Sequence, residues 1–286
     1  DELDKVMAAS AIYGPDVLSP APARKAARRI SLGRIPLRRI VRYAAELAAV
    51  AVVGVGLARM LADDRIGEWA RRTTALEVPA GQYLSMELQD GTKVWLNAGT
   101  RLEYPLVFAG GERRVKVAGE AMFDVEHDPA HPFVVETFAC DVEVLGTKFD
   151  VTAEEREGLF SAALLRGSVK VTNRLTPGEQ FVLKPNEEVR LAGRRLNLNA
   201  IGSMDDYLWT EGMISIKGLS FGELMHKFEK SFGVKIRIDR VRMPEVDYNH
   251  GKIRISDGVD SALRLLQMAS DFTYTRSEDN GTIVIR

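Results

Sequence analysis

Two histidines stand at the spacing that a helical metal site uses. His127 and His131 are four residues apart, and three acidic residues lie around them. Side chains four residues apart share one helix face, and imidazole is a common zinc ligand. Pro129 and Pro132 exclude a regular helix there, because proline removes a backbone donor and clashes with the preceding turn. We therefore expect a solvated loop and no metal at this position.

The remaining candidates for chemistry are sparse. The sequence lacks a Gly-x-Ser-x-Gly elbow, a phosphate-binding loop and a dinucleotide fingerprint. Glu154 and Glu155 are adjacent, which is typical of a charged loop and not of an acid/base pair. The single cysteine, Cys140, excludes an intramolecular disulfide and a cysteine-based metal cluster, and we expect it to be a small buried side chain. These patterns predict a protein that is not an enzyme and has no metal or cofactor.

A basic cluster followed by an apolar segment predicts a membrane anchor. Residues 24–42 hold eight Lys or Arg and no acidic residue, and they run into the mostly apolar segment 43–61. Positive charge stays on the cytoplasmic side, so we expect a single pass through the bacterial inner membrane, with a cytoplasmic N-terminus and periplasmic C-terminal domains. Polar anchor contacts are expected from the charged residues at or near this segment, namely Arg38, Arg39, Arg42, Glu46 and Arg59.

The uncharged part of the segment, 47–58, is shorter than the ~20 residues that cross a bilayer. We expect Arg42 and Arg59 to reach the headgroups and Glu46 to pair with Arg42 one helical turn away. A buried helix or a signal-type apolar region is the alternative. The net charge of −1 gives no overall attraction to nucleic acid, so the basic cluster is interpreted as a lipid-facing flank.

Beyond the anchor, short alternating runs separated by turn residues predict a β-rich region. The runs are Tyr83 to Leu88, Lys93 to Leu96, Glu112 to Ala118, Phe133 to Thr137, Asp141 to Leu145, Ser168 to Val171 and Gln180 to Leu183. Asp90-Gly91, Gly110-Gly111 and Pro177-Gly178 mark reversals. This spacing favours an all-β sandwich or a solenoid-like stack of strands, and both stay open.

After Ser203 the pattern changes to strands alternating with helices. Ser220 and Glu223 form a capping-box signature, an apolar helical face follows, and Gly233 is a natural stop. A weaker second unit has Asp257 as the expected helix cap and Asn280-Gly281 as a hairpin turn. The fold class is therefore mainly β with α+β: one transmembrane helix, an all-β domain and a small domain of two strand-helix-strand halves.

These patterns divide the chain into five parts. We expect a cytoplasmic tether at 1–40, a transmembrane helix at 41–61, a juxtamembrane linker at 62–78, the all-β domain at 79–200 and the α+β domain at 203–286.

Several strings resemble the extracytoplasmic domain of FecR-type transmembrane anti-sigma regulators. They are Val78-Pro-Ala-Gly81, Leu88-Gln-Asp-Gly-Thr-Lys-Val-Trp-Leu-Asn97, the stretch around Gly119-Glu120-Ala121, Val144-Leu-Gly-Thr-Lys-Phe149 and Arg166-Gly-Ser-Val-Lys-Val171. The part after Ser203 resembles the family's C-terminal domain, which is related to the short N-terminal domains of secretins and TonB-dependent receptors. Residues 1–40 depart from the family, because they are too few and too proline-rich for its helical sigma-binding domain.

The resemblance implies a function and partners. The chain is expected to be an anti-sigma regulator that relays a signal from an outer-membrane TonB-dependent transporter to an extracytoplasmic-function sigma factor. Its partners would be that sigma factor, the transporter's periplasmic signalling domain and the lipid bilayer, without direct nucleic-acid binding. The alternative is an envelope scaffold that holds a transporter or a secretion component without signalling.

The partner is expected to pair with an edge strand of the small domain, since an open edge offers backbone groups to another chain. Two candidate edges stay open: Gly212, Met213, Ile214, Ser215 and Ile216, or Thr282, Ile283, Val284 and Ile285.

The resemblance also implies a candidate for self-cleavage at Gly146-Thr147, in which the Thr147 hydroxyl would attack the preceding carbonyl. The alternative is a tight strand junction in which Thr147 only forms hydrogen bonds.

Overall fold

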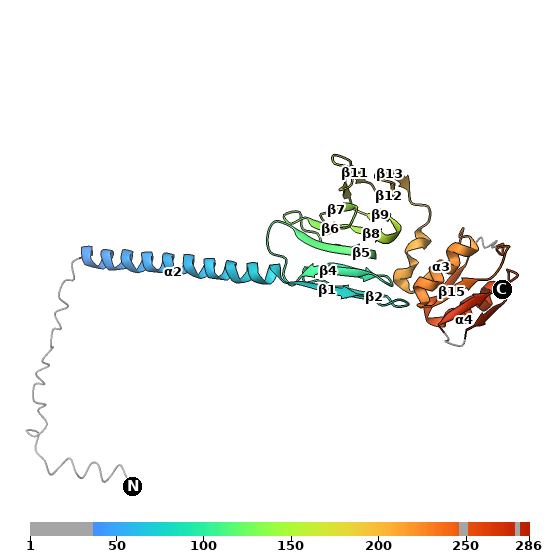
Figure 1. The fold of residues 1–286 in the computed structure, drawn as a ribbon. Helices are drawn as coiled ribbons and strands as arrows, with labels where there is room; N and C mark the ends of the chain where they lie inside the picture. The colour runs from blue at the N-terminus through green and yellow to red at the C-terminus, as the bar shows by residue number, and fades with distance from the viewer. Residues whose placement is uncertain (1–36, 246–250, 278–280) are drawn as a thin grey trace, which may run out of the picture. The chain divides into compact units, whose positions relative to one another are not determined.

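The computed structural model describes residues 37–245, 251–277 and 281–286 (Figure 1). Its residues fall into two units, Asp1–Arg59 and Met60–Arg286. Most of the expected tether, residues 1–36, lies outside the described residues.

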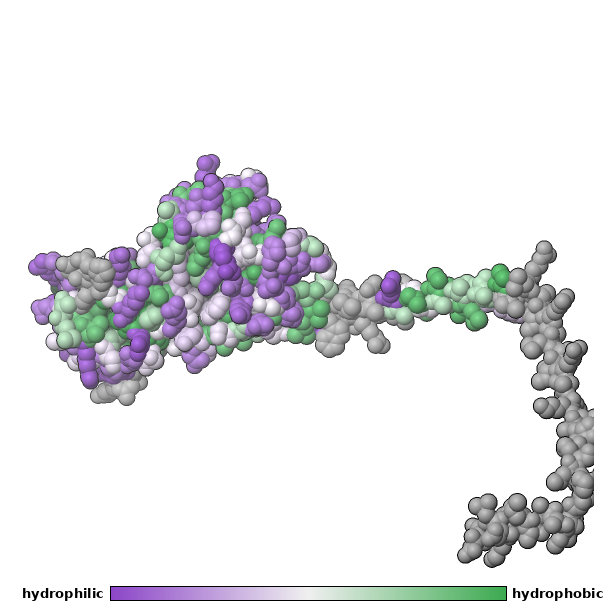
Figure 2. Space-filling view, turned by 180° about the vertical axis from the view of Figure 1, so that it is seen from behind, coloured by the Kyte–Doolittle hydropathy of each residue, from purple (hydrophilic) through white to green (hydrophobic). Residues whose placement is uncertain are grey.

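Helix α2, Leu37–Arg71, contains the expected membrane segment. Within it, Val41–Arg59 is 19 residues long with a mean hydropathy of 1.6, which is enough to cross a bilayer by length and composition. The described side chains of this stretch are exposed, and Figure 2 shows them as a mainly green surface. The Nε of Arg42 lies 3.2 Å from Oε1 of Glu46, so the predicted pair is confirmed. The side chains of Arg38 and Arg39 lie outside the described ones.

The segment expected as a linker, 62–78, contains the end of α2 and strand β1, Thr73–Glu77. Helix α2 continues to Arg71, and strand β1 follows almost at once. Half of residues 62–71 are good helix formers (Ala62, Arg65, Glu68, Ala70 and Arg71), and no proline interrupts the helix there. The β fold therefore begins at Thr73 and not at residue 79.

The β-rich region forms a network of thirteen described strands. After β1 they are β2 (Leu84–Glu87), β3 (Lys93–Leu96), β4 (Arg101–Pro105), β5 (Arg113–Asp124), β6 (Phe133–Glu136), β7 (Cys140–Val144), β8 (Lys148–Glu154), β9 (Leu159–Arg166), β10 (Val169–Asn173), β11 (Gln180–Leu183), β12 (Glu187–Ala192) and β13 (Arg195–Ala200). A 3-10 turn, η1 (Glu155–Glu157), joins β8 to β9.

The long strand β5 joins the two halves of this network. Its first half, 113–118, pairs with β4 and, in parallel, with β6. Its second half, 119–124, pairs with β3 and β8. Gly119 stands at the change of neighbours with φ 114°, and a Cβ there would lie 2.6 Å from Oγ1 of Thr100, so only glycine fits. The sheet thus folds over on itself into a near-barrel (Figure 1).

One apolar core fills this near-barrel. Phe123 stacks on Phe149 with ring centroids 5.3 Å apart and also contacts Phe133, and all three are fully buried. Cys140 belongs to the same core, which confirms the expected small buried side chain. Burial raises the pKa of its thiol to about 12.

The C-terminal fold contains the two expected strand-helix-strand halves. The first comprises β14 (Met213–Ser215), α3 (Phe221–Phe232) and β15 (Lys235–Ile238), and the second comprises β16 (Lys252–Arg254), α4 (Val259–Gln267), β17 (Tyr274–Arg276) and β18 (Thr282–Ile285). A 3-10 helix, η2 (Met204–Glu211), leads into β14, and a 3-10 turn, η3 (Ile255–Asp257), precedes α4. A second core, separate from the first, lies between these elements.

Helix α3 begins and ends as its sequence predicts. Both hydrogen bonds of the Ser220–Glu223 capping box form, and Gly233 is the C-cap with φ 65°. The predicted cap of α4 is wrong, because Asp257 ends η3 and Gly258 occupies the N-cap without a side-chain bond.

Candidate functional site

The two candidate edge strands differ in their neighbours. Strand β18 pairs with β15 on one side and with β17 on the other, so Thr282–Ile285 is the centre of its sheet and the expectation of an edge there is wrong. Strand β14 pairs only with β16 among the described strands. Of the two candidates, β14 is the one that offers an edge.

The register of β14 shows which of its backbone groups face outward. Gly212 accepts a hydrogen bond from the N–H of Ile255, and Ile216 donates to Gly251. Because hydrogen-bonded pairs alternate in an antiparallel ladder, the backbone groups of Met213 and Ser215 point away from β16. Ser215 is buried as a whole residue, at 3% exposed, and Met213 is half-buried, so Met213 is the accessible position of this edge.

A second feature, which the sequence did not single out, joins the C-terminal fold to the β fold. The Nζ of Lys230, in the last turn of α3, lies 2.6 Å from Oε1 of Glu154 and 3.3 Å from Oε2 of Glu120. Glu154 is the last residue of β8, and Glu120 lies in β5. The side-chain amide of Asn97, just after β3, also donates a hydrogen bond to Glu120 at 2.7 Å. We call Lys230, Glu120 and Glu154 the lysine clamp.

Electrostatics favour the charged forms of Lys230 and Glu154. Burial alone would lower the pKa of Lys230, but the charges and hydrogen bonds of Glu120 and Glu154 outweigh burial and raise it. Burial likewise opposes the charge of Glu154, whereas the hydrogen bond from Lys230 lowers the pKa of this carboxyl. The two pKa shifts therefore favour a charged pair of Lys230 and Glu154.

A third carboxyl lies behind the clamp. Asp150 of β8 is 4% exposed, and its Oδ1 has no hydrogen-bond partner among the described residues. Burial raises its pKa well above the ordinary value, and the charge of Glu120 raises it further, whereas Lys230 opposes both. Tyr207 of η2 lies near Asp150. Burial raises the pKa of the Tyr207 hydroxyl, and the charge of Asp150 raises it further. Asp150 thus favours a proton in this setting.

Close backbone contact accompanies the clamp. Gly81 donates its N–H to the carbonyl of Lys230 at 3.1 Å. A Cβ built on Gly81 would lie 2.8 Å from backbone atoms of Phe232 and Gly233, and one on Gly233 would lie 2.8 Å from the carbonyl oxygen of Ala80. Gly81 and the C-cap Gly233 therefore let the backbone of residues 80–81 approach the backbone at the end of α3 closely.

The Gly146-Thr147 site lies in the β fold, between β7 and β8. The Thr147 side chain is buried, and its hydroxyl donates to the carbonyl of Ser168 at 2.9 Å. Its own carbonyl accepts from the N–H of Val125. A methyl group on Gly146 would collide with the imidazole of His127, so this ring lies against the peptide.

The two histidines of the loop 127–131 have different neighbours. His131 bonds Asp128 through Nδ1 at 2.7 Å, and this hydrogen bond lowers the pKa of the carboxyl. Among the described residues, no group of three His, Cys, Asp or Glu side chains could hold a metal ion.

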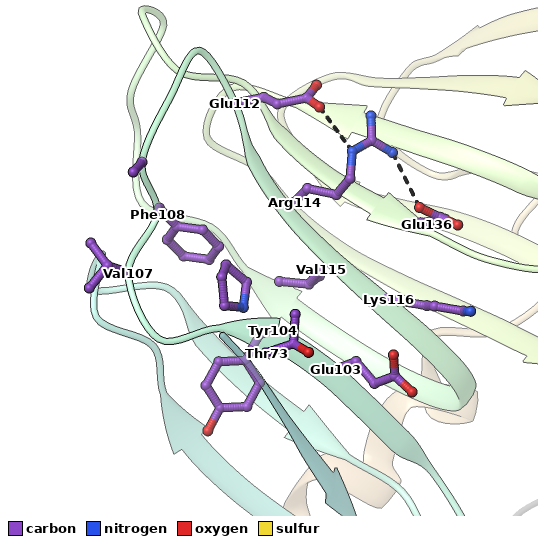
Figure 3. Close-up of a pocket in the computed structure, with 12 residues that line it drawn as sticks. Thr73, Glu103, Tyr104, Val107, Phe108, Glu112, Arg114, Val115, Lys116 and Glu136 are labelled. Atoms are coloured by element: carbon purple, nitrogen blue, oxygen red, sulfur yellow. Dashed lines mark hydrogen bonds and ion pairs between the residues drawn. The ribbon is translucent and has the colours of Figure 1, made fainter. Parts of the chain in front are cut away.

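Figure 3 shows a pocket of about 370 Å³ between β4, β5 and the loop that joins them. Arg114 points across it and pairs with Glu112 at 2.9 Å and Glu136 at 3.6 Å. Because these carboxylates neutralise the guanidinium, the pocket presents no uncompensated arginine to a ligand.

Known protein families and solved structures match both the β fold and the C-terminal fold. The family model for FecR protein matches residues 74–170, and the model for FecR, C-terminal matches residues 213–285. Crystal structures of a candidate anti-sigma factor from Parabacteroides distasonis ATCC 8503, at 1.65 and 2.50 Å resolution, are similar to this chain. Each is 28% identical with a TM-score of 0.63, over 74% and 75% of this chain and 98% of the other. No curated protein sequence matches the chain.

Proposed function

Because the chain belongs to the FecR family, as its motifs predicted, we propose that it is a single-pass inner-membrane anti-sigma regulator. One observation carries the proposal: both family domains follow, in order, a helix that could span a membrane. The solved relatives described as candidate anti-sigma factors support a sigma factor as the partner. In its finer form, the protein relays a signal from a TonB-dependent transporter to an extracytoplasmic-function sigma factor.

A membrane-spanning regulator must have two states that its partners distinguish. A transporter can change the cytoplasmic end only if it binds one state of the periplasmic folds more tightly than the other. The described edge of β14 is where we propose that the transporter's signalling domain docks. Pairing there would satisfy the outward backbone groups of the half-buried Met213.

The docking edge is tested with two substitutions at one residue. Met213→Pro removes the outward N–H, whereas Met213→Ala keeps it and removes only the side chain. We expect the purified full chain in detergent micelles to lose binding to the isolated signalling domains of the same bacterium's transporters with Met213→Pro, and to keep it with Met213→Ala. Calorimetry measures binding and circular dichroism checks the fold. Equal binding by both folded variants contradicts the docking edge.

An envelope scaffold remains the competing function, and a cellular assay separates the two. Deleting the gene should change expression from a sigma-dependent promoter if the chain regulates a sigma factor, and the complete protein should co-purify with that factor. A deletion that alters transporter assembly but leaves every sigma-dependent promoter unchanged supports the scaffold.

Orientation is tested by protease accessibility. Protease added outside spheroplasts should digest the domains that follow α2, because the basic residues before the span stay on the cytoplasmic side. A C-terminal tag that is digested only after lysis reverses the proposed topology.

We further propose that Thr147 is a structural residue and that the protein is not an enzyme. The hydrogen bond that the buried Thr147 hydroxyl donates to the carbonyl of Ser168 supports this, since it gives the side chain a role in joining two segments of the β fold. Intact mass spectrometry of the purified chain should find one species, with the same result for Thr147→Ala apart from the substitution. Two fragments that meet at Gly146 and Thr147, and that Thr147→Ala abolishes, would establish self-cleavage instead.

A further inference from the structure

The contact between the C-terminal fold and the β fold includes a cluster of charged side chains. The core of the β fold and the core of the C-terminal fold share no described residue. Between them stands the lysine clamp, whose three side chains are each 20–26% exposed. Polar contacts between domains separate more easily than apolar ones, because water can take over the hydrogen bonds.

The clamp is also unbalanced in charge. One lysine faces the carboxylates Glu120 and Glu154, with Asp150 buried behind them. Removing Lys230 leaves carboxylates of like charge close together and partly out of water, which is unfavourable until they hydrate. Lys230 is therefore the side chain whose positive charge holds these carboxylates together across the contact.

The clamp lies beside the segment that leads back to the membrane helix. Gly81, which donates to the Lys230 carbonyl, is four residues from the end of β1. Val78 between them is buried in the β-fold core and exchanges backbone hydrogen bonds with Gly99 and Thr100. Strand β1 in turn follows α2 after a single residue. Lys230 of α3 is thus hydrogen-bonded to the segment that leads through β1 back to the end of α2.

Helix α3 and the proposed docking edge share one packed core. Ile214 of β14 and Leu224 and Phe228 of α3 are fully buried in one core. Because a close-packed core transmits displacement, we expect a partner that shifts β14 to shift α3 as well. We propose that the lysine clamp is a latch between the two folds, and that a partner docked on the C-terminal fold signals by opening it. The signalling half of this inference rests on the proposed function, and the latch itself does not.

The latch is tested by distance measurement on the full chain in detergent micelles. Spin labels at Ala192→Cys and Met268→Cys report the separation of the folds, since both positions are exposed and the buried Cys140 stays unlabelled. Lys230→Glu places like charges together and should shift the distance distribution to longer and broader values. Lys227→Glu, on the same helix but outside the clamp, is the matched control and should leave the distribution unchanged.

Rescue distinguishes an opened latch from a damaged fold. Adding Glu154→Lys to Lys230→Glu restores an opposite pair and should return most of the narrow distribution. Lys230→Met serves if the charge reversal fails to fold, with circular dichroism as the check. Identical distributions for the folded Lys230 variants and the Lys227→Glu control overturn the latch.

The signalling half has its own readout. In cells, Lys230→Glu should make a sigma-dependent reporter independent of the inducing signal, whereas Lys227→Glu keeps the response. If Lys230→Glu opens the latch and the reporter still responds fully to the inducing signal, then opening of the latch does not carry the signal. A reporter that does not respond even to deletion of the gene contradicts the proposed function, and the distance measurement still decides the latch.

Discussion

Replacing Gly81 by alanine should loosen the contact between the two folds through a steric clash alone. The new Cβ would lie 2.8 Å from the backbone of Phe232 and Gly233. A comfortable carbon contact is about 3.5 Å, so the chains must part by roughly 0.7 Å. That movement stretches the 3.1 Å bond from Gly81 to the Lys230 carbonyl beyond hydrogen-bonding distance.

The magnitude follows from what is lost. A backbone hydrogen bond contributes about 0.5–1.5 kcal/mol and a part-exposed ion pair about 0.2–1 kcal/mol. The contact should weaken by about 1–2 kcal/mol, which is roughly a 5- to 30-fold rise in opening. Alanine at positive φ adds a local strain of about 1–2 kcal/mol of its own. Gly193 has φ 65° with nothing within 4 Å of a built Cβ, so Gly193→Ala isolates that strain.

Hydrogen exchange read by mass spectrometry measures the opening in the full chain. Gly81→Ala should speed exchange in the last turn of α3 and in residues 78–83, and Gly193→Ala should not. If both substitutions change exchange in α3 equally, or neither does, the close backbone contact does not hold the folds together.

Three further predictions concern the β fold. Arg113 forms a buried pair with Asp90 at 2.8 Å, so Arg113→Met should lower the free energy of unfolding by about 3–5 kcal/mol, against about 0–1 kcal/mol for the exposed Arg101→Met, as measured by denaturant titration. The raised pKa of Asp150 makes a contribution to stability that is fully present below the unfolded pKa and is lost as pH rises through the folded pKa. Asp150→Asn should therefore flatten the fall of melting temperature with rising pH. An unchanged pH profile contradicts this. Cys140 should react with maleimide only after unfolding, because it is buried and its pKa is about 12, and rapid labelling of the native protein would refute its place in the core.

The sequence predicted those elements whose ends or faces are set by residues close together along the chain. The capping box of Ser220 and Glu223 and the stop at Gly233 act within a few residues, so the sequence alone placed α3. Strands with one exposed face, such as Lys93–Leu96, alternate visibly and were predicted. Strands β8 and β9 were not, because their central residues are buried on both faces and their sequences do not alternate.

The candidate sites depended on distant pairings that local patterns do not encode. Thr282–Ile285 looked like an edge and is the central strand, since its two neighbours come from elsewhere in the C-terminal fold. Glu154 looked like part of a solvated loop, and it meets Lys230, which is 76 residues away in sequence. The sequence by itself determined the family, the order of the folds and the candidate span. Tertiary structure decided which edge is open and which charges meet, because both depend on packing between residues that are far apart along the chain.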